Sequence, residues 1–132
     1  MPYLHLRLSQ PPAADTLARV ANTLTDLTVE LLGKRRDLTA LAVTVVPPGQ
    51  WFVGGAVLPG QSYQLDIKVT DGTNTADEKA RFIAQVHATL EALLGPMHTA
   101  SYVVVDDVDG RAWGYQGRTQ TARRQAQPQA AL

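Results

Sequence analysis

An internal repeat with a constant offset of 62 residues constrains the fold of this chain more than any other feature. ADTLAR at 14–19 recurs as ADEKAR at 76–81, LLG at 31–33 recurs at 93–95, and WFVGG at 51–55 corresponds to WGYQG at 113–117. Because all three matches share one offset, we interpret them as a duplication. The repeats span residues 2–58 and 62–118 of a 132-residue chain, whose length is typical of one domain.

Each repeat begins and ends with a predicted strand. Apolar and polar residues alternate over 2–9 and 62–70, which is typical of strands with one buried face. The segments at 38–46 and 100–107 are rich in β-branched residues and predict the second strand of each repeat.

An amphipathic helix is predicted between the two strands of each repeat. Apolar residues spaced three and four apart indicate both helices, and glycines at 33 and 95 are placed to end them. Asp15 lies in the first turn of the first helix, and Thr75 with Glu78 has the spacing of a capping box at the start of the second.

The strand–helix–strand order predicts the fold class. Such a crossover makes its two strands parallel and covers one face of the sheet with the helix. Two units therefore predict an α/β fold in which a four-stranded sheet carries two helices on one face. We expect residues 1–118 to form this single domain and residues 119–132, which are polar and of low complexity, to form a flexible tail.

The composition excludes several classes of protein. Twelve basic and twelve acidic residues give a net charge near zero, which argues against binding to nucleic acid or to a membrane surface. The chain has no cysteine, its three histidines lack metal-ligand spacing, and no apolar run approaches the roughly 20 residues of a membrane span. We expect a cytoplasmic protein without metal or cofactor.

The second residue is a candidate catalytic base. Removal of Met1 would leave Pro2 with a secondary amine, a base unlike any side chain; the alternative is that Pro2 is only the outer end of a strand. An apolar surrounding would lower the amine pKa from about 7.7–8.0 toward neutrality. Trp51, Phe52 and Trp113 are candidates for that lining, although both tryptophans could instead pack the repeated turns against neighbouring subunits.

These features together resemble the tautomerase superfamily, whose members carry an amino-terminal catalytic proline. The resemblance rests on Pro2, the duplication, PPGQWFVGG at 47–55 and DGTNTADEKARFIAQ at 71–85, and covers residues 2–118. Among members with two fused units, the chain is most similar to the cis-3-chloroacrylic acid dehalogenase group. The resemblance implies a homotrimer with one catalytic proline per chain.

The chain departs from that group at several functional positions. Thr70 and Thr73 stand where the group has two arginines. Positions that match other functional side chains of the superfamily also carry uncharged residues, namely Thr28, Val103, Gly114, Pro12 and Ala42. We therefore expect cis-3-haloacrylate dehalogenation to be weak.

Without those two arginines, a carboxylate substrate would need another group of this chain to bind its negative charge. One candidate is the loop before the second helix, where Thr70, Thr73 and Asn74 could assist the free backbone amides. Other candidates are Arg111 and Arg118 beside the final turn.

A third candidate for binding the carboxylate is Arg7 together with Lys68, which lie on the polar faces of the repeated strands. Asp66 is an alternative, purely structural partner for Arg7.

The expected activity is tautomerisation of a small 2-hydroxydienoate or an arylpyruvate enol. The alternatives are a member that lost its chemistry and binds a small molecule or serves structurally, or a weak cis-3-haloacrylate dehalogenase or hydratase.

Overall fold

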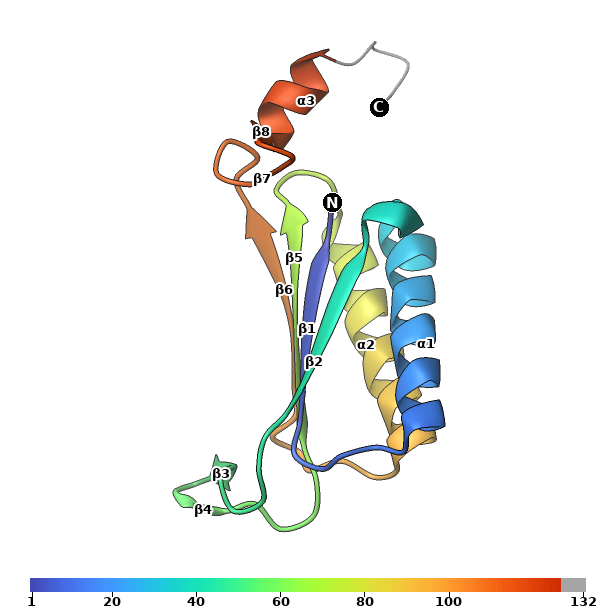
Figure 1. The fold of residues 1–132 in the computed structure, drawn as a ribbon, viewed down its shortest axis with the longest axis vertical. Coiled ribbons are helices and arrows are strands. Elements are labelled where there is room, and N and C mark those ends of the chain that lie inside the picture. Colours follow the sequence, from blue (N-terminus) through green and yellow to red (C-terminus); the bar gives the residue numbers. More distant parts are fainter. Residues whose placement is uncertain (127–132) are drawn as a thin grey trace.

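The computed structural model describes residues 1–126 (Figure 1). In chain order the elements are β1 (Tyr3–Leu8), α1 (Ala14–Leu32), the 3₁₀ helix η1 (Arg36–Leu38), β2 (Ala40–Val45), β3 (Phe52–Val53), β4 (Ala56–Val57), β5 (Tyr63–Thr70), α2 (Ala76–Leu94), β6 (Tyr102–Val108), β7 (Gly114–Tyr115), β8 (Arg118–Thr119) and α3 (Gln120–Ala126). Both long helices and both small hairpins recur at the offset of 62 residues.

The sheet joins the two repeats through their first strands. Its order is β2-β1-β5-β6, with β1 parallel to β2, β5 parallel to β6, and β1 antiparallel to β5. Helices α1 and α2 lie side by side on one face of this sheet (Figure 1). The structure thus confirms the predicted α/β fold.

The antiparallel join places equivalent parts of the two repeats at opposite ends of the molecule. The β3–β4 hairpin of the first repeat lies at one end, and the β7–β8 hairpin of the second repeat lies at the other (Figure 1). The chain's amino end and α3 share the end that carries β7–β8 (Figure 1).

The hydrophobic core lies between the sheet and the two helices. The alternation predicted for β1 is present, because Leu4, Leu6 and Leu8 are at most 2% exposed while Tyr3 is 37% exposed on the other face. The core side chains are Leu4, Leu6, Leu8, Val20, Leu24, Leu32, Tyr63, Leu65, Ile67, Val69, Phe82, Val86 and Leu90.

The predicted helix ends are also present. Gly33 ends α1 with a left-handed backbone (φ 68°), which glycine adopts at little cost. Thr75 and Glu78 form the predicted capping box of α2: the Thr75 side chain accepts from the Glu78 amide at 3.1 Å, and the Glu78 carboxylate accepts from the Thr75 amide at 2.7 Å. Ala13, the equivalent residue of α1, offers no side-chain cap.

The outer face of the sheet carries ion pairs between strands. Arg7 contacts Asp66 at 2.8 Å, which confirms the expected structural pair, and Lys68 contacts Asp106 at 3.3 Å. Both cations therefore have carboxylate partners on the outer face of the sheet, and neither is among the residues that line the cleft described below.

The prediction of a flexible tail over 119–132 is wrong for residues 119–126, because Thr119 belongs to β8 and residues 120–126 form α3. The Gln120 amide donates to the Trp113 carbonyl at 2.7 Å, and the Arg123 guanidinium stacks 3.7 Å from the centre of the Tyr115 ring. These contacts fix the helix to the β7–β8 hairpin, a stabilisation that composition does not reveal. The rest of the predicted tail, 127–132, lies outside the described residues.

None of the helices formed by residues 1–126 has the length and apolar character needed to cross a membrane. Within the same part of the chain, acidic and histidine side chains form no group of three or more that could hold a metal ion.

The equivalent positions before α1 and α2 allow a matched pair of substitutions, because Thr75 caps its helix and Ala13 does not. We expect Thr75→Ala to lower the free energy of unfolding by about 1 kcal/mol, because the α2 cap is lost, and Ala13→Thr to raise it by up to about 1 kcal/mol. Urea denaturation at one fixed protein concentration measures both. Equal stability of Thr75→Ala and the wild type would contradict the role of the capping box.

Candidate functional site

The amino end lies where β1 begins and β5 ends. Tyr3 pairs with Lys68 in the antiparallel register, which places Met1 and Pro2 beside the last residues of β5. Pro2 is buried, and its carbonyl accepts a hydrogen bond from the Ala40 amide of β2 at 3.3 Å. The amino end is therefore held between β2 and β5.

A cleft of about 470 Å³ opens at this end. Its walls come from the end of α1 and the following turn, from the end of β5 and its loop, and from the β7–α3 segment. The lining residues are Met1, Leu32, Gly33, Lys34, Arg35, Leu38, Thr70, Gly72, Thr73, Tyr115, Gln120, Arg123 and Arg124. We call this space the amino-terminal cleft.

The amino-terminal cleft is strongly cationic. Its described lining includes Lys34, Arg35, Arg123 and Arg124 but no carboxylate. Arg35 is compensated by Asp37 at 2.6 Å outside the cleft. Neither Lys34 nor Arg124 forms an ion pair with any residue between 1 and 126.

The burial and the positive charges at this end change the pKa of the terminal amine. Burial, followed by the positive charges of Lys34, Arg124 and Arg35, lowers the pKa of the Met1 amine below its ordinary value of 8.0. The neutral amine is the basic form, so the site favours the state that can accept a proton.

Lys34 is directed into the cleft by the turn that ends α1. Gly33 reverses the chain, and the Lys34 ammonium then donates to the Thr73 hydroxyl at 2.8 Å, which itself donates to the Thr70 carbonyl at 2.6 Å. Burial lowers the pKa of Lys34 below its ordinary value; the charge of Glu78 opposes this shift, and that of Arg124 adds to it. A partly desolvated cation of this kind is suited to binding a carboxylate.

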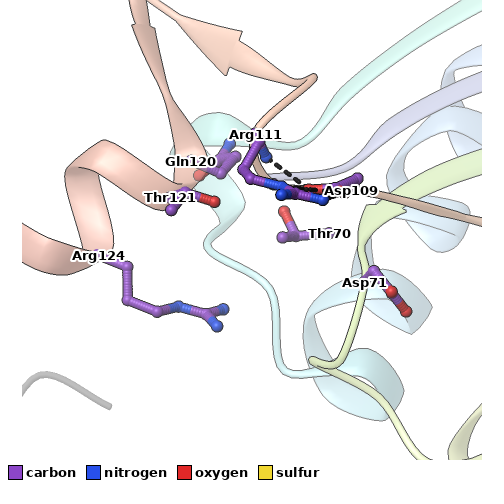
Figure 2. A pocket seen from close by; sticks show the side chains of 8 residues that line it. Thr70, Asp71, Asp109, Arg111, Gln120, Thr121 and Arg124 are labelled. Carbon is purple, nitrogen blue, oxygen red and sulfur yellow. Dashed lines mark hydrogen bonds and ion pairs between the residues drawn. The ribbon is translucent and has the colours of Figure 1, made fainter.

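A second cavity of about 250 Å³ adjoins the cleft (Figure 2). It is lined by Thr70, Asp71, Asp109, Gly110, Arg111, Gln120, Thr121 and Arg124, so it shares Thr70, Gln120 and Arg124 with the cleft. Arg111 lies 2.7 Å from Asp109, and its hydrogen bonds lower the pKa of Asp109 to about 2. Arg111 is thus already compensated.

The structure brings two of the predicted site residues to the amino end. Thr70 and Thr73 line the cleft with Met1. Asn74, which follows them, donates to the Leu32 carbonyl at 2.9 Å and so ties the loop to the end of α1.

Other predicted residues lie elsewhere. Within one chain, Trp51 and Phe52 belong to the region of the β3–β4 hairpin, at the opposite end of the sheet from Pro2 (Figure 1). Trp113 immediately precedes β7 and Arg118 is the first residue of β8, at the same end of the sheet as Pro2, but neither is among the described residues that line the two cavities.

Sequence reasoning missed the four cations of the cleft. Lys34 and Arg35 follow the helix-ending Gly33, so a basic pair after a predicted helix end was an available signal. Arg123 and Arg124 lie in the segment that was expected to be flexible, and no periodicity marks them.

The arrangement can perform one kind of chemistry. A neutral amine beside uncompensated cations can accept a proton from a bound anionic molecule and return it to another atom. The cations would stabilise negative charge that develops on the molecule during that transfer.

Comparison with known sequences gives two matches. A family model described as "Tautomerase enzyme" matches residues 65–123. The Probable tautomerase K2 of Dickeya dadantii (strain 3937) is 34% identical over 61 residues, which cover 46% of this chain and 91% of that protein. That relative therefore corresponds in length to about one repeat.

Solved structures show the same fold over nearly the whole chain. A fused 4-OT described as a wild-type symmetric trimer matches with a TM-score of 0.83 and 19% identity, covering 92% of this chain and 98% of that one. Native fused 4-OT matches with a TM-score of 0.83 and 22% identity, covering 91% and 97%. Pt0534 inactivated by 2-oxo-3-pentynoate matches with a TM-score of 0.84 and 16% identity, covering 92% and 98%.

The charges around the amino end predict how its amine titrates. Because the positive charge of Lys34 lowers the amine pKa, Lys34→Met should raise it, and the amine should then become reactive only at higher pH. The pH dependence of acetylation of the amino-terminal amine, followed by peptide mass spectrometry, measures this shift. Arg19→Gln, at the distant start of α1, is the control and should leave the titration unchanged; no shift in Lys34→Met would contradict the electrostatic account.

Proposed function

The chain belongs to the tautomerase family, and we propose that it moves a proton within small enol or keto carboxylates, with the Pro2 amine as general base. The observation that carries this proposal is the position of the amino end: Met1 lines a cationic cleft of a size suited to a small ligand, and Pro2, which follows it, is buried.

The proposal requires that Met1 be removed. While Met1 is attached, the Pro2 nitrogen is an amide without useful basicity. After removal, the free amine lies one residue further along the chain, on the buried Pro2 that precedes β1. We expect its pKa to be lowered by the causes that act on the Met1 amine, namely burial first and then Lys34, Arg124 and Arg35.

Lys34 would hold the substrate carboxylate. Its ammonium is fixed by Thr73 at 2.8 Å and has no carboxylate partner among the described residues, so a bound anion would complete its hydrogen bonding. In this pose the negative charge that develops on the enolate lies close to a partly buried cation. The structure therefore offers a replacement for the arginines absent at Thr70 and Thr73.

The substrates that fit this chemistry are 2-hydroxydienoates and arylpyruvate enols. In either case the amine would take the hydroxyl proton of the enol and return it to carbon, forming the ketone. A cis-3-haloacrylate would also need an activated water, and the described lining of the cleft contains no carboxylate to activate one. We therefore keep dehalogenation as a weak side activity at most.

A catalytically inactive binding protein is the second candidate. The uncharged Thr70 and Thr73 at the positions of the family arginines favour it. The buried amino end and the uncompensated Lys34 favour the enzyme.

Kinetics of Pro2→Ala separate the two candidates. With phenylenolpyruvate and 2-hydroxymuconate as substrates, we expect the variant to lose about 10²–10⁴-fold in rate, the usual contribution of a general base. Intact mass spectrometry of the wild type should show that Met1 is absent. Equal rates for wild type and variant, or a fully retained Met1 in an active protein, would contradict the role of Pro2.

We further propose that the chain assembles as a homotrimer. The solved fused 4-OT structures with this fold include a symmetric trimer. The outer face of the sheet exposes Tyr102 (60%) and Val104 (43%), while the β3–β4 hairpin exposes Phe52 (59%), and a subunit interface would cover such apolar side chains. In an assembly, Trp51 and Phe52 could also approach the cleft of a neighbouring subunit.

Light scattering tests the assembly. We expect a mass three times the 14.3 kDa of one chain. Val104→Asp should reduce this mass because it places a charge in the apolar interface, whereas Ile83→Asp, exposed on α2, should not. A stable monomer in the wild type would contradict the trimer.

A further inference from the structure

The chain contains two aspartate–glycine steps, Asp71–Gly72 and Asp109–Gly110. Such a step is reactive because glycine has no side chain to hinder attack of its backbone nitrogen on Cγ of the preceding aspartate. The N–Cγ bond forms, and the carboxyl hydroxyl leaves with the amide proton as water, which gives a succinimide ring. Water then reopens the ring to aspartate or to isoaspartate, in which the backbone runs through the former side chain.

The structure leaves the first of these steps free to react. Asp71 and Gly72 are exposed at the start of the loop between β5 and α2, and the Asp71 carboxylate has no ion-pair partner between residues 1 and 126. Figure 2 shows the Asp71 side chain directed away from Arg111 and Arg124.

The glycine of the same step is also unhindered. Gly72 has a left-handed backbone (φ 78°), and no atom lies within 4 Å of the place that a Cβ would occupy. Its amide donates to no backbone carbonyl in the part of the chain that the structure describes. The nucleophile, the carboxyl and the space for the ring are therefore all available at Asp71–Gly72.

The second step is held in an unreactive state. The Asp109 carboxylate accepts a hydrogen bond from the Arg111 amide at 2.9 Å and lies 2.7 Å from the Arg111 guanidinium. These bonds lower the pKa of Asp109 to about 2, so the carboxyl stays ionised and has no hydroxyl to lose. A Cβ on Gly110 would lie only 2.8 Å from the Thr121 hydroxyl oxygen, which shows how little room the ring would find there.

We propose that Asp71 is a site of spontaneous isomerisation in the folded protein, and that Arg111 protects the otherwise equivalent step at Asp109. The reaction needs only water and no partner protein. It is also independent of the proposed function, because neither Asp71 nor Arg111 has a role in that chemistry.

Isomerisation would change the loop that ties β5 to α1. Isoaspartate at 71 adds one carbon to the backbone just before Thr73 and Asn74, which bond to the Lys34 ammonium and to the Leu32 carbonyl. We therefore expect protein that has isomerised at 71 to unfold at a lower urea concentration than fresh protein. Asp71→Glu, aged in the same way, should show no such loss.

Ageing of the wild-type protein tests the site. The folded protein is incubated at physiological temperature and mildly acidic pH, and electron-transfer fragmentation of its peptides distinguishes isoaspartate from aspartate, which has the same mass. We expect isoaspartate to accumulate at 71 and to stay near its starting level at 109. The same incubation in urea that unfolds the protein should bring the two rates together, because the fold then protects neither step.

Two variants separate the site from its protection. Arg111→Gln should raise isoaspartate at 109 on the order of tenfold, the change in protonated fraction that corresponds to each pKa unit. Asp71→Glu keeps the charge but would need a less favoured six-membered ring, so it should abolish the product at 71. Arg19→Gln, at the distant start of α1, is the control and should change neither rate. Circular dichroism confirms that each variant is folded.

Two results would overturn the reactive site: equal rates at 71 and 109 in the folded wild type, or no isoaspartate at 71 under conditions in which the unfolded chain forms it. An unchanged level at 109 in Arg111→Gln would overturn the protective role of Arg111. None of these results depends on whether the protein has Pro2-dependent activity, so failure here is distinguishable from failure of the proposed function.

Discussion

The antiparallel pairing of β1 with β5 is the constraint on which the rest of the structure depends. Its register places Leu4 and Leu6 of β1 opposite Ile67 and Leu65 of β5, and all four face the helices. A slip by one residue would turn these side chains to the outer face, so burial of the core fixes the register. The same register places the amino end beside Thr70 and hence among the loops that form the cleft.

The position of the amino end determines its chemistry. Three segments that are distant in sequence meet there: the turn after α1, the loop after β5, and α3. Two of them contribute uncompensated cations, which disfavour the charged form of the amine and at the same time provide partners for a carboxylate. The same surroundings thus lower the pKa of the terminal amine and, under the proposed function, would also bind the carboxylate of the substrate.

The sequence predicts what periodicity and local chemistry determine, including the sheet, both long helices, the Gly33 end and the capping box. It does not predict the cleft, because the turn containing Lys34 and the α3 segment containing Arg123 have no periodic pattern. Helix α3 is stabilised by stacking on Tyr115, a contact that appears only after the fold brings them together. Trp51 was expected near Pro2, but the antiparallel join places equivalent turns of the two repeats at opposite ends of the chain.

Covalent labelling with 2-oxo-3-pentynoate, the compound that inactivated the structurally similar Pt0534, tests the central claim most directly. An activated alkynyl ketone of this kind is an acceptor for a neutral amine, and its carboxylate matches the cationic cleft. We predict a single adduct on the peptide that begins with Pro2, located on its amine by fragmentation in the mass spectrometer, and loss of activity in proportion to labelling. An adduct on Lys34 instead, or an active protein with Pro2 unmodified at full labelling, would contradict the account.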